Sequence, residues 1–306
     1  MAKRPRKPDP PGIAASPPSS ALRVAGAVGL GWLEGLPVPV LAAWPGAARR
    51  TGQRPLALVL HGLLGRPLLL ADWLAELALA GWVAAAPALP FGEDPELRRR
   101  LPTHFFEALD GAVQQAVPLL EQVTRALAGW RGADARRLAV VGISAGGFAA
   151  LRLALRPKTA EAAAAAGASV AAVAAVVSGP GWLEVPAGLP QALQEELGTG
   201  ALSARPQRPF TAEQYPGVHG AFVLERAEQL QGTAVLLCCG GRDSVVPVEP
   251  ARQLHFRLAR LFGAGAEEGR QQLLVYPTLG HRVTPAMKQR VVAWLRWMVE
   301  TAPPAP

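Results

Sequence analysis

Cysteine is scarce in this chain: among 306 residues there are two, Cys238 and Cys239, and they are adjacent. They fall in an apolar run that is typical of a strand, where neighbouring side chains point to opposite faces. A disulfide between them is therefore not expected, and the sequence has no CxxC pair or Cys/His cluster that would indicate zinc. We interpret both as small buried residues in a reducing compartment, and we predict neither a metal nor a cofactor.

Long apolar segments are also missing. The basic residues 1–12 resemble the start of a signal peptide, but proline and serine follow where an apolar stretch should begin. The stretch 21–44 is interrupted by glycine, glutamate and proline, which argues against a membrane span. We therefore expect a cytoplasmic protein without a membrane partner.

Positive charge is concentrated at the start of the chain. The formal net charge is +8, and Lys3, Arg4, Arg6 and Lys7 supply four of these charges, which leaves +4 for the rest. Aromatic residues make up only 6% of the sequence, so a basic surface interleaved with aromatic rings is not expected, nor is a nucleic-acid partner. Residues 1–20 are rich in Pro, Lys, Arg and Ser and are predicted to be a disordered basic tail. An interaction of this tail with a partner is a further hypothesis, and it is compatible with catalysis.

Short apolar runs alternate with segments of helical periodicity from residue 56 onward. The apolar runs span 56–60, 82–86, 138–141, 170–178, 233–241 and 272–276. The helical patterns span 67–80, 102–128, 248–262 and the segment that begins at Thr284. Pro118 is expected to kink or split the second of these helices. This alternation predicts an α/β fold with a mostly parallel central sheet and helices on both faces.

The predicted domain organisation is simple. We expect residues 21–303 to form a single domain after the tail, with a low-complexity loop or extra helix at 157–170. The segment 182–222 is longer than a minimal connection and rich in Pro, Gly and Glu, so we interpret it as a small cap insertion over a site. Four aromatic residues of this segment could line a pocket or could only pack the cap on the sheet: Trp182, Phe210, Tyr215 and Phe222.

One serine lies between two glycines where a predicted strand meets a predicted helix. The stretch GISAG at 142–146 follows the apolar run 138–141 and precedes an Ala/Leu-rich segment. In a Gly-x-Ser-x-Gly motif, the small residues let the chain turn sharply and hold the serine in a strained, exposed conformation. Ser144 is therefore a candidate nucleophile, and the alternative is a small residue at an ordinary strand-to-helix junction.

A serine hydroxyl needs a base to take its proton, usually an imidazole that a carboxylate orients. Of the five histidines, only His255 and His281 lie well beyond the strand that should carry the acid. His255 falls in a helical pattern, whereas His281 lies in the loop PTLGHRVT and is the predicted base. Asp243, which follows the run 233–241, is the predicted acid unless it only caps its own turn. The order Ser144, Asp243, His281 places each residue after a different strand.

The oxygen of an attacked carbonyl also needs hydrogen-bond donors that are already in position. The stretch LVLHGLLG ends the first long apolar run, and we expect the backbone N–H of Leu63 to point into the site. The second predicted donor is the N–H of Ala145, at the positive end of the helix after Ser144. His61 is interpreted as a support for this loop rather than as a base.

Together, LVLHGLLG, GISAGG, GGRDSVVP and GHRVT resemble the α/β-hydrolase superfamily, and most of all its small bacterial esterases of the dienelactone-hydrolase and prolyl-oligopeptidase-like branch. The resemblance implies an α/β-hydrolase fold. It also implies a nucleophile, an acid, a base and two oxyanion donors at Ser144, Asp243, His281, Leu63 and Ala145, respectively. Because the nucleophile is serine and not cysteine, dienelactone hydrolase activity itself is not expected.

The sequence therefore predicts a serine hydrolase that cleaves carboxylic esters of small molecules through an acyl-enzyme. A peptidase, a thioesterase or an acyltransferase could use the same groups. A binding protein that keeps the fold without catalysis is the alternative from another class. The sequence does not predict the acyl specificity or the oligomeric state.

Overall fold

The computed structural model describes residues 22–24, 28–46, 53–156, 170–197, 205–263 and 269–301. The predicted tail, residues 1–20, lies outside the described residues, as do 157–169 of the low-complexity stretch and 198–204 of the predicted cap. Within the described ranges, no helix is both long and apolar enough to cross a membrane.

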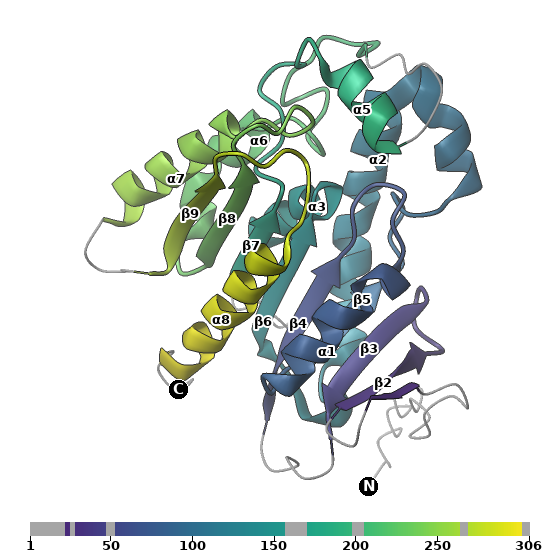
Figure 1. Ribbon diagram of the computed structural model, residues 1–306, viewed down its shortest axis with the longest axis vertical. Helices are drawn as coiled ribbons and strands as arrows, with labels where there is room; N and C mark the ends of the chain where they lie inside the picture. Colours follow the sequence, from purple (N-terminus) through teal and green to yellow (C-terminus); the bar gives the residue numbers. More distant parts are fainter. Residues whose placement is uncertain are drawn as a thin grey trace, which may run out of the picture.

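The described strands form one nine-stranded sheet with the order β1-β2-β3-β5-β4-β6-β7-β8-β9 (Figure 1). Their bounds are Leu22–Val24 (β1), Val28–Leu33 (β2), Val40–Pro45 (β3), Arg54–Leu60 (β4), Val83–Pro87 (β5), Ala133–Ile143 (β6), Val170–Val176 (β7), Ala234–Gly240 (β8) and Gln271–Tyr276 (β9). Neighbours from β5 to β9 in this order run parallel, whereas β1, β2 and β3 pair antiparallel at one edge. The predicted mostly parallel sheet is confirmed.

The strand order reverses around β4, because β5 pairs with one of its edges and β6 with the other. Leu60 on β4 lies opposite Gly142 on β6, so these two strands end at the same level. Where the order of a parallel sheet reverses, the loops after neighbouring strands diverge and leave a crevice at the carboxyl ends. The predicted oxyanion loop and the predicted nucleophile turn follow these two strands.

Helices cover both faces of the sheet (Figure 1). One face is covered by α1 (Ala71–Leu79) and α8 (Pro285–Thr301), and the other by α2 (Pro95–Leu127), α3 (Ala145–Ala154) and α7 (Glu249–Phe262). The other helices of the described chain are short: η2 (Pro67–Leu70), η3 (Trp130–Gly132), α5 (Leu189–Leu197), α6 (Ala221–Leu224) and η4 (Ala227–Leu230). The sheet thus separates two apolar cores, as the alternating sequence pattern predicts.

The two cysteines on β8 contribute one side chain to each of the two apolar cores. Cys238 packs in the core under α1 and α8, and Cys239 packs in the core on the opposite face. Both thiols are free, and burial raises the pKa of each to about 12. Both therefore remain neutral thiols at ordinary pH.

Helix α2 is longer than predicted and is not split at Pro118. It begins at Pro95, about two turns earlier than expected, and the Asp94 side chain caps it by accepting a hydrogen bond from the Glu96 N–H (2.9 Å). Within α2, which is described throughout, the one residue with non-helical backbone angles is His104. Pro118 is exposed, so water can solvate the carbonyl that the proline ring leaves without a donor.

The predicted cap, here called the cap segment, comprises the described residues 182–197 and 205–222 and lies beyond the carboxyl ends of the strands (Figure 1). Arg152 on α3 is buried beneath it. The guanidinium donates hydrogen bonds to the backbone oxygens of Pro216 (2.6 Å) and His219 (3.1 Å) in the cap segment. Burial lowers the pKa of Arg152 to about 9, so the side chain is still protonated at neutral pH.

Helix α2 holds the same part of the cap segment through two carboxylates. Asp110 accepts a hydrogen bond from the backbone N–H of Gly217 (2.7 Å). A Cβ on Gly217 would lie 2.4 Å from the Asp110 carbonyl oxygen, so a larger residue would not fit without a backbone shift. One turn earlier on α2, Glu107 accepts hydrogen bonds from the Tyr215 hydroxyl and from the Gln207 N–H (2.8 Å). Side chains of α2 and α3 therefore attach the cap segment to the sheet.

Candidate active site

Ser144 forms a sharp turn between β6 and α3, as the motif predicts. Its backbone lies in the left-handed region (φ 53°, ψ −119°), which is strained for a residue with a side chain. Tight packing maintains the turn: a Cβ on Gly142 would lie 2.2 Å from the Gly146 carbonyl oxygen, and a Cβ on Gly146 would lie 2.6 Å from that of Leu60. The Ser144 N–H donates to the Val176 carbonyl on β7 (3.0 Å). The neighbouring strands thus hold the hydroxyl at the carboxyl end of the sheet.

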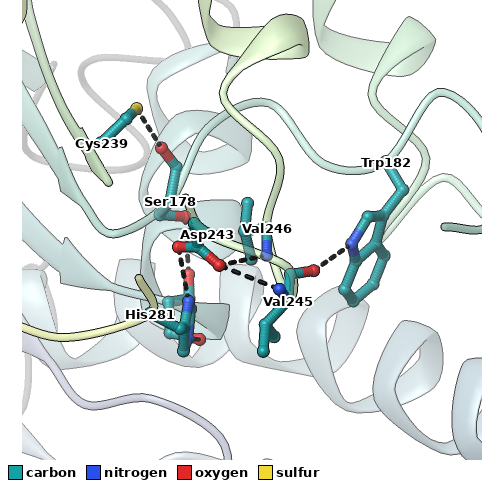
Figure 2. A network of polar contacts seen from close by, with 8 residues as sticks. Ser178, Trp182, Cys239, Asp243, Val245, Val246 and His281 are labelled. Atoms are coloured by element: carbon teal, nitrogen blue, oxygen red, sulfur yellow. Dashed lines mark hydrogen bonds and ion pairs between the residues drawn. The ribbon is translucent and has the colours of Figure 1, made fainter. Parts of the chain in front are cut away.

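A second serine, Ser178, supports this turn from just beyond β7. Its hydroxyl donates a hydrogen bond to the Ser144 carbonyl oxygen (2.7 Å), and its own carbonyl accepts one from the Cys239 thiol (3.3 Å; Figure 2). A Cβ on Gly147 would lie 2.2 Å from the Ser178 hydroxyl oxygen, so the glycine after the motif makes room for the contact. Sequence reasoning missed Ser178, although a polar residue that ends an apolar run is a signal that could have indicated it.

The structure brings Ser144, His281 and Asp243 into one row of hydrogen bonds. The Ser144 Oγ lies 2.9 Å from the His281 Nε2, and the Asp243 Oδ2 lies 2.8 Å from the His281 Nδ1. The Asp243 side chain is fully buried, and that of His281 is 10% exposed. Because an ionised carboxylate can only accept, Nδ1 carries the proton and Nε2 is left to accept one from the hydroxyl. Three separate strand ends thus meet in an arrangement suited to proton transfer from the serine.

Backbone N–H groups orient the carboxylate of Asp243. Its Oδ1 accepts hydrogen bonds from the N–H groups of Val245 (2.9 Å) and Val246 (2.8 Å; Figure 2). We call residues 243–246 the acid turn. The carboxylate caps this turn with one oxygen and contacts the imidazole with the other, so capping of its own turn does not prevent the contact that a catalytic acid would need.

The loop that carries His281 packs against the residues between β8 and the acid turn through backbone contacts. A Cβ on Gly240 would lie 2.4 Å from the Gly280 carbonyl oxygen, so glycine is required at the end of β8. The Arg242 N–H donates to the Leu279 carbonyl (2.8 Å). The positions of the carboxylate and the imidazole are therefore set together.

The predicted oxyanion donors, Leu63 and Ala145, line the same cavity as the serine. Ala145 is the first residue of the ten-residue helix α3, so its N–H has no acceptor within the helix and lies at the positive end of the helix dipole. Leu63 lies in the loop after β4, where Leu64 has a φ of 56° and donates its N–H to the Phe91 carbonyl (2.8 Å). That these two N–H groups bind an oxyanion stays a prediction.

His61 supports the loop that carries Leu63. The ring is buried, and its Nδ1 donates to the Gly62 carbonyl (2.9 Å) while its Nε2 accepts from the Leu89 N–H (3.2 Å). Burial lowers the pKa of His61, which favours this neutral form. Both ring nitrogens are engaged by backbone groups, so the geometry agrees with the structural role inferred from the sequence.

A cavity of about 410 Å³ lies beside Ser144. Its walls come from the loops at the strand ends, from α2 and α3, and from the cap segment. The large apolar side chains that α2, α3 and the cap segment contribute are Phe105, Leu109, Phe148, Trp182 and Leu193. A substrate that reaches the serine would therefore contact a mainly apolar surface.

The four aromatic residues considered as pocket walls have different positions. Trp182 lines the cavity, whereas Phe210 and Tyr215 pack the cap segment onto α2, with ring centroids 5.0 and 6.1 Å from that of Phe106. Phe222 lies under the guanidinium of Arg226, 4.1 Å from its ring centroid. Packing of the cap, the alternative considered for all four, thus describes three of them.

Trp182 also makes a polar contact that sequence reasoning did not predict. Its indole N–H donates to the Val245 carbonyl oxygen (2.7 Å; Figure 2). The peptide N–H of the same valine donates to Asp243, so the indole and the carboxylate hold the acid turn from two sides. One residue therefore belongs to both the cavity wall and the support of the predicted acid.

The remaining candidate base, His255, lies on α7 and does not line the cavity. Among the described residues, no group of three or more His, Cys, Asp or Glu side chains is placed to hold a metal ion.

Solved structures share this architecture. TT1662 from Thermus thermophilus matches over 90% of this chain and 99% of its own, with a TM-score of 0.66 and 21% identity. A proposed dienelactone hydrolase from Klebsiella pneumoniae matches over 88% and 98%, with a TM-score of 0.55 and 20% identity. A cold-adapted esterase from an Arctic intertidal metagenomic library matches over 92% and 98%, with a TM-score of 0.58 and 15% identity. At such identities the similarity establishes the fold alone, which is the predicted α/β-hydrolase fold.

Comparison of the sequence with protein families adds a second line of evidence. Among curated proteins, no sequence matches significantly. The family model of the prolyl oligopeptidase family matches residues 116–302, which is more than half of the chain and includes all three residues of the hydrogen-bonded row. The resemblance inferred from the sequence motifs is thus confirmed: the chain belongs to the prolyl oligopeptidase family, within the α/β-hydrolase superfamily.

Proposed function

We propose that the protein is a serine hydrolase that cleaves carboxylic esters through an acyl-enzyme. The observation that carries this proposal is the uninterrupted contact from the Asp243 carboxylate through both nitrogens of His281 to the Ser144 hydroxyl. A hydroxyl becomes a nucleophile when a neighbouring base takes its proton, and the carboxylate keeps the imidazole in the tautomer that can do so. The names of several structural neighbours, among them the Arctic esterase, agree with ester chemistry.

The proposed reaction has two steps. Ser144 attacks the acyl carbon while His281 takes the hydroxyl proton and passes it to the leaving alcohol, which leaves the acyl group on the serine oxygen. Water then attacks this ester, His281 takes a proton from the water, and the acid is released as Ser144 regains its proton. The N–H groups of Leu63 and Ala145 would stabilise the negative oxygen formed in both steps.

Hydrolysis of peptide bonds is the second candidate function, and the match to the prolyl oligopeptidase family favours it. Ester and amide substrates with the same acyl group separate the two candidates, for example p-nitrophenyl hexanoate and hexanoyl p-nitroanilide. We expect the ester to react and the anilide to be left uncleaved. Since a p-nitrophenyl ester is intrinsically far more reactive than an anilide, any cleavage of the anilide that Ser144→Ala abolishes would instead support a peptidase.

The direct test is reaction with a fluorophosphonate, which phosphonylates an activated serine with loss of fluoride. Peptide mass spectrometry should place the adduct on Ser144, and the Ser144→Ala variant should show none. The matched control is Thr103→Ala, because Thr103 carries an exposed hydroxyl on α2, does not line the cavity and should not affect labelling. A folded protein that stays unlabelled and hydrolyses no ester would support the binding-protein alternative.

A further inference from the structure

The interior of the cavity beside Ser144 offers almost no polar side chain to a substrate. Among the described residues that line it, Arg282 adds one charged side chain to Ser144 and His281, and this side chain is exposed. The polar atom of Trp182 is already bonded to the Val245 carbonyl oxygen. A hydroxyl, ammonium or carboxylate placed deep in this cavity would lose its hydration without gaining a partner, and such a loss is costly.

The apolar wall and the imidazole belong to different parts of the molecule, and this decides which end of an ester the wall contacts. A leaving alcohol must lie next to the His281 Nε2, since it receives its proton there. Arg282 and Val283 follow His281 directly, so they border that side. The apolar wall comes from α2, α3 and the cap segment, through Leu109, Phe148 and neighbouring residues. The acyl group is the part of the substrate that remains to occupy it.

The size of the cavity excludes a good fit for the smallest acyl groups. An acetyl group needs roughly the space of two to three water molecules, of about 30 Å³ each. The cavity measures about 410 Å³, so most of it would be left unfilled. Its aromatic walls pack against each other, with ring centroids of Trp182 5.1 Å from Phe148 and 6.2 Å from Phe105, which limits collapse around a small group.

We infer that this cavity selects apolar acyl groups larger than acetyl, such as hexanoyl, octanoyl or benzoyl, and excludes acyl groups that carry a charge. The inference rests on the proposed ester hydrolysis and specifies its substrate class. Trp182, Leu109 and Leu193 contact the acyl group. Each methylene that enters the cavity raises kcat/KM about fourfold until the cavity is filled.

The experiment compares p-nitrophenyl esters of acetate, butanoate, hexanoate and octanoate, so that the leaving group stays constant. We expect kcat/KM to rise about fourfold per methylene over the first members. The p-nitrophenyl monoester of adipic acid has a six-carbon chain that ends in a carboxylate, and it should react at least about a hundredfold more slowly than the hexanoate.

Two tryptophan variants of α2 test the wall itself. Leu109→Trp occupies part of the cavity with a larger side chain and should weaken the preference, so that kcat/KM stops rising at a shorter acyl chain than in the original protein. Leu119→Trp is the matched control, because Leu119 lies on the same helix, is partly buried and does not line the cavity; it should keep the preference of the original protein. Labelling of Ser144 by a fluorophosphonate verifies that each variant is folded.

The outcomes separate the inference from the proposed function. A flat or falling acyl series, or an unchanged series in Leu109→Trp, would overturn the inference while hydrolysis and labelling still support the esterase. No hydrolysis of any ester together with no labelling would overturn both.

Discussion

The loops at the strand ends and the cap segment meet at the same cavity, but they are held in different ways. Backbone contacts at Gly142, Gly146 and Gly240 leave no room for a side chain and set the loops of the predicted catalytic residues. The cap segment is instead held by side chains, above all Arg152 and Asp110. The contrast indicates that substitutions should affect the chemistry and the selectivity of this site separately.

The largest effect on kcat is expected when the predicted acid, Asp243, is replaced. In Asp243→Asn the amide can donate to the His281 Nδ1, which favours the tautomer that cannot take the serine proton. We expect kcat for p-nitrophenyl hexanoate to fall about 10⁴-fold with little change in KM. Asp94→Asn is the control, because asparagine caps a helix as well as aspartate does. A fall of less than about tenfold would remove Asp243 from the proposed mechanism.

The next effect concerns the attachment of the cap segment. Arg152→Met removes several hydrogen bonds from a buried charged group, and we expect it to lower the free energy of unfolding by about 3 kcal/mol. Arg156→Met is the matched control just beyond the end of α3, since it removes a partly exposed ion pair with Glu121 and should cost under about 1 kcal/mol. Urea unfolding measures both.

The Arg152→Met variant also tests whether the cap segment affects substrate selectivity. Where Arg152→Met remains folded, KM for the hexanoate should rise more than KM for the acetate, because the cap segment contributes to the apolar wall. Equal changes in KM for both esters would mean that the cap segment has no effect on selectivity separate from that of the loops at the strand ends.

A smaller effect is expected at the residue that joins the two regions. Trp182→Phe keeps an aromatic wall but loses the hydrogen bond to Val245, so the acid turn is less firmly held. We expect kcat to fall about tenfold for acetate and hexanoate alike, the equivalent of roughly one hydrogen bond, while KM rises only for hexanoate, whose longer acyl group contacts the smaller ring. Trp294→Phe is the control, because its indole N–H makes a similar bond (2.9 Å) to Gly269 on the opposite face of the sheet. Equal kcat in the two variants would leave Trp182 with a packing role alone.

The smallest effect depends on pH. Burial alone would raise the pKa of Glu107, but hydrogen bonds from the Tyr215 hydroxyl and the Gln207 N–H outweigh it and lower the pKa below the usual 4.5. A carboxyl whose folded pKa is lowered stabilises the protein above its unfolded pKa, and this contribution is lost as the pH falls through the folded value. The difference in Tm between the original protein and Glu107→Gln should therefore be constant near neutral pH and shrink below about pH 4.5. Gln115→Ala, an exposed change on the same helix that removes no titratable group, should show no such trend.

The sequence predicts the positions of the strand-end residues well because buried parallel strands are short, continuous apolar runs that end sharply. Asp243 and His281 each follow such a run, so their convergence with Ser144 at one edge follows from the topology of a parallel sheet. The start of α2 could also have been predicted, since Asp94 followed by Pro95 has the pattern of a helix N-cap and first turn.

The contacts of the cap segment, in contrast, could not be predicted from the sequence. Arg152 lies in an Ala/Leu-rich helix, and nothing in its local pattern indicates that it binds Pro216 and His219 from another part of the chain. The bond from Trp182 to Val245 also joins residues far apart in sequence. Such contacts depend on how two irregular segments approach each other, and periodicity carries no information about that approach.

The strained turn at Ser144 has a consequence for the order in which the protein assembles. The bonds that hold this turn come from Val176 and Ser178, and the imidazole follows the serine by 137 residues. As the chain is synthesised from its amino end, the serine emerges long before the groups that would hold and activate it. A chain that does not yet include His281 therefore exposes an ordinary hydroxyl, and the proposed reactivity requires that the residues up to 281 have been made and folded.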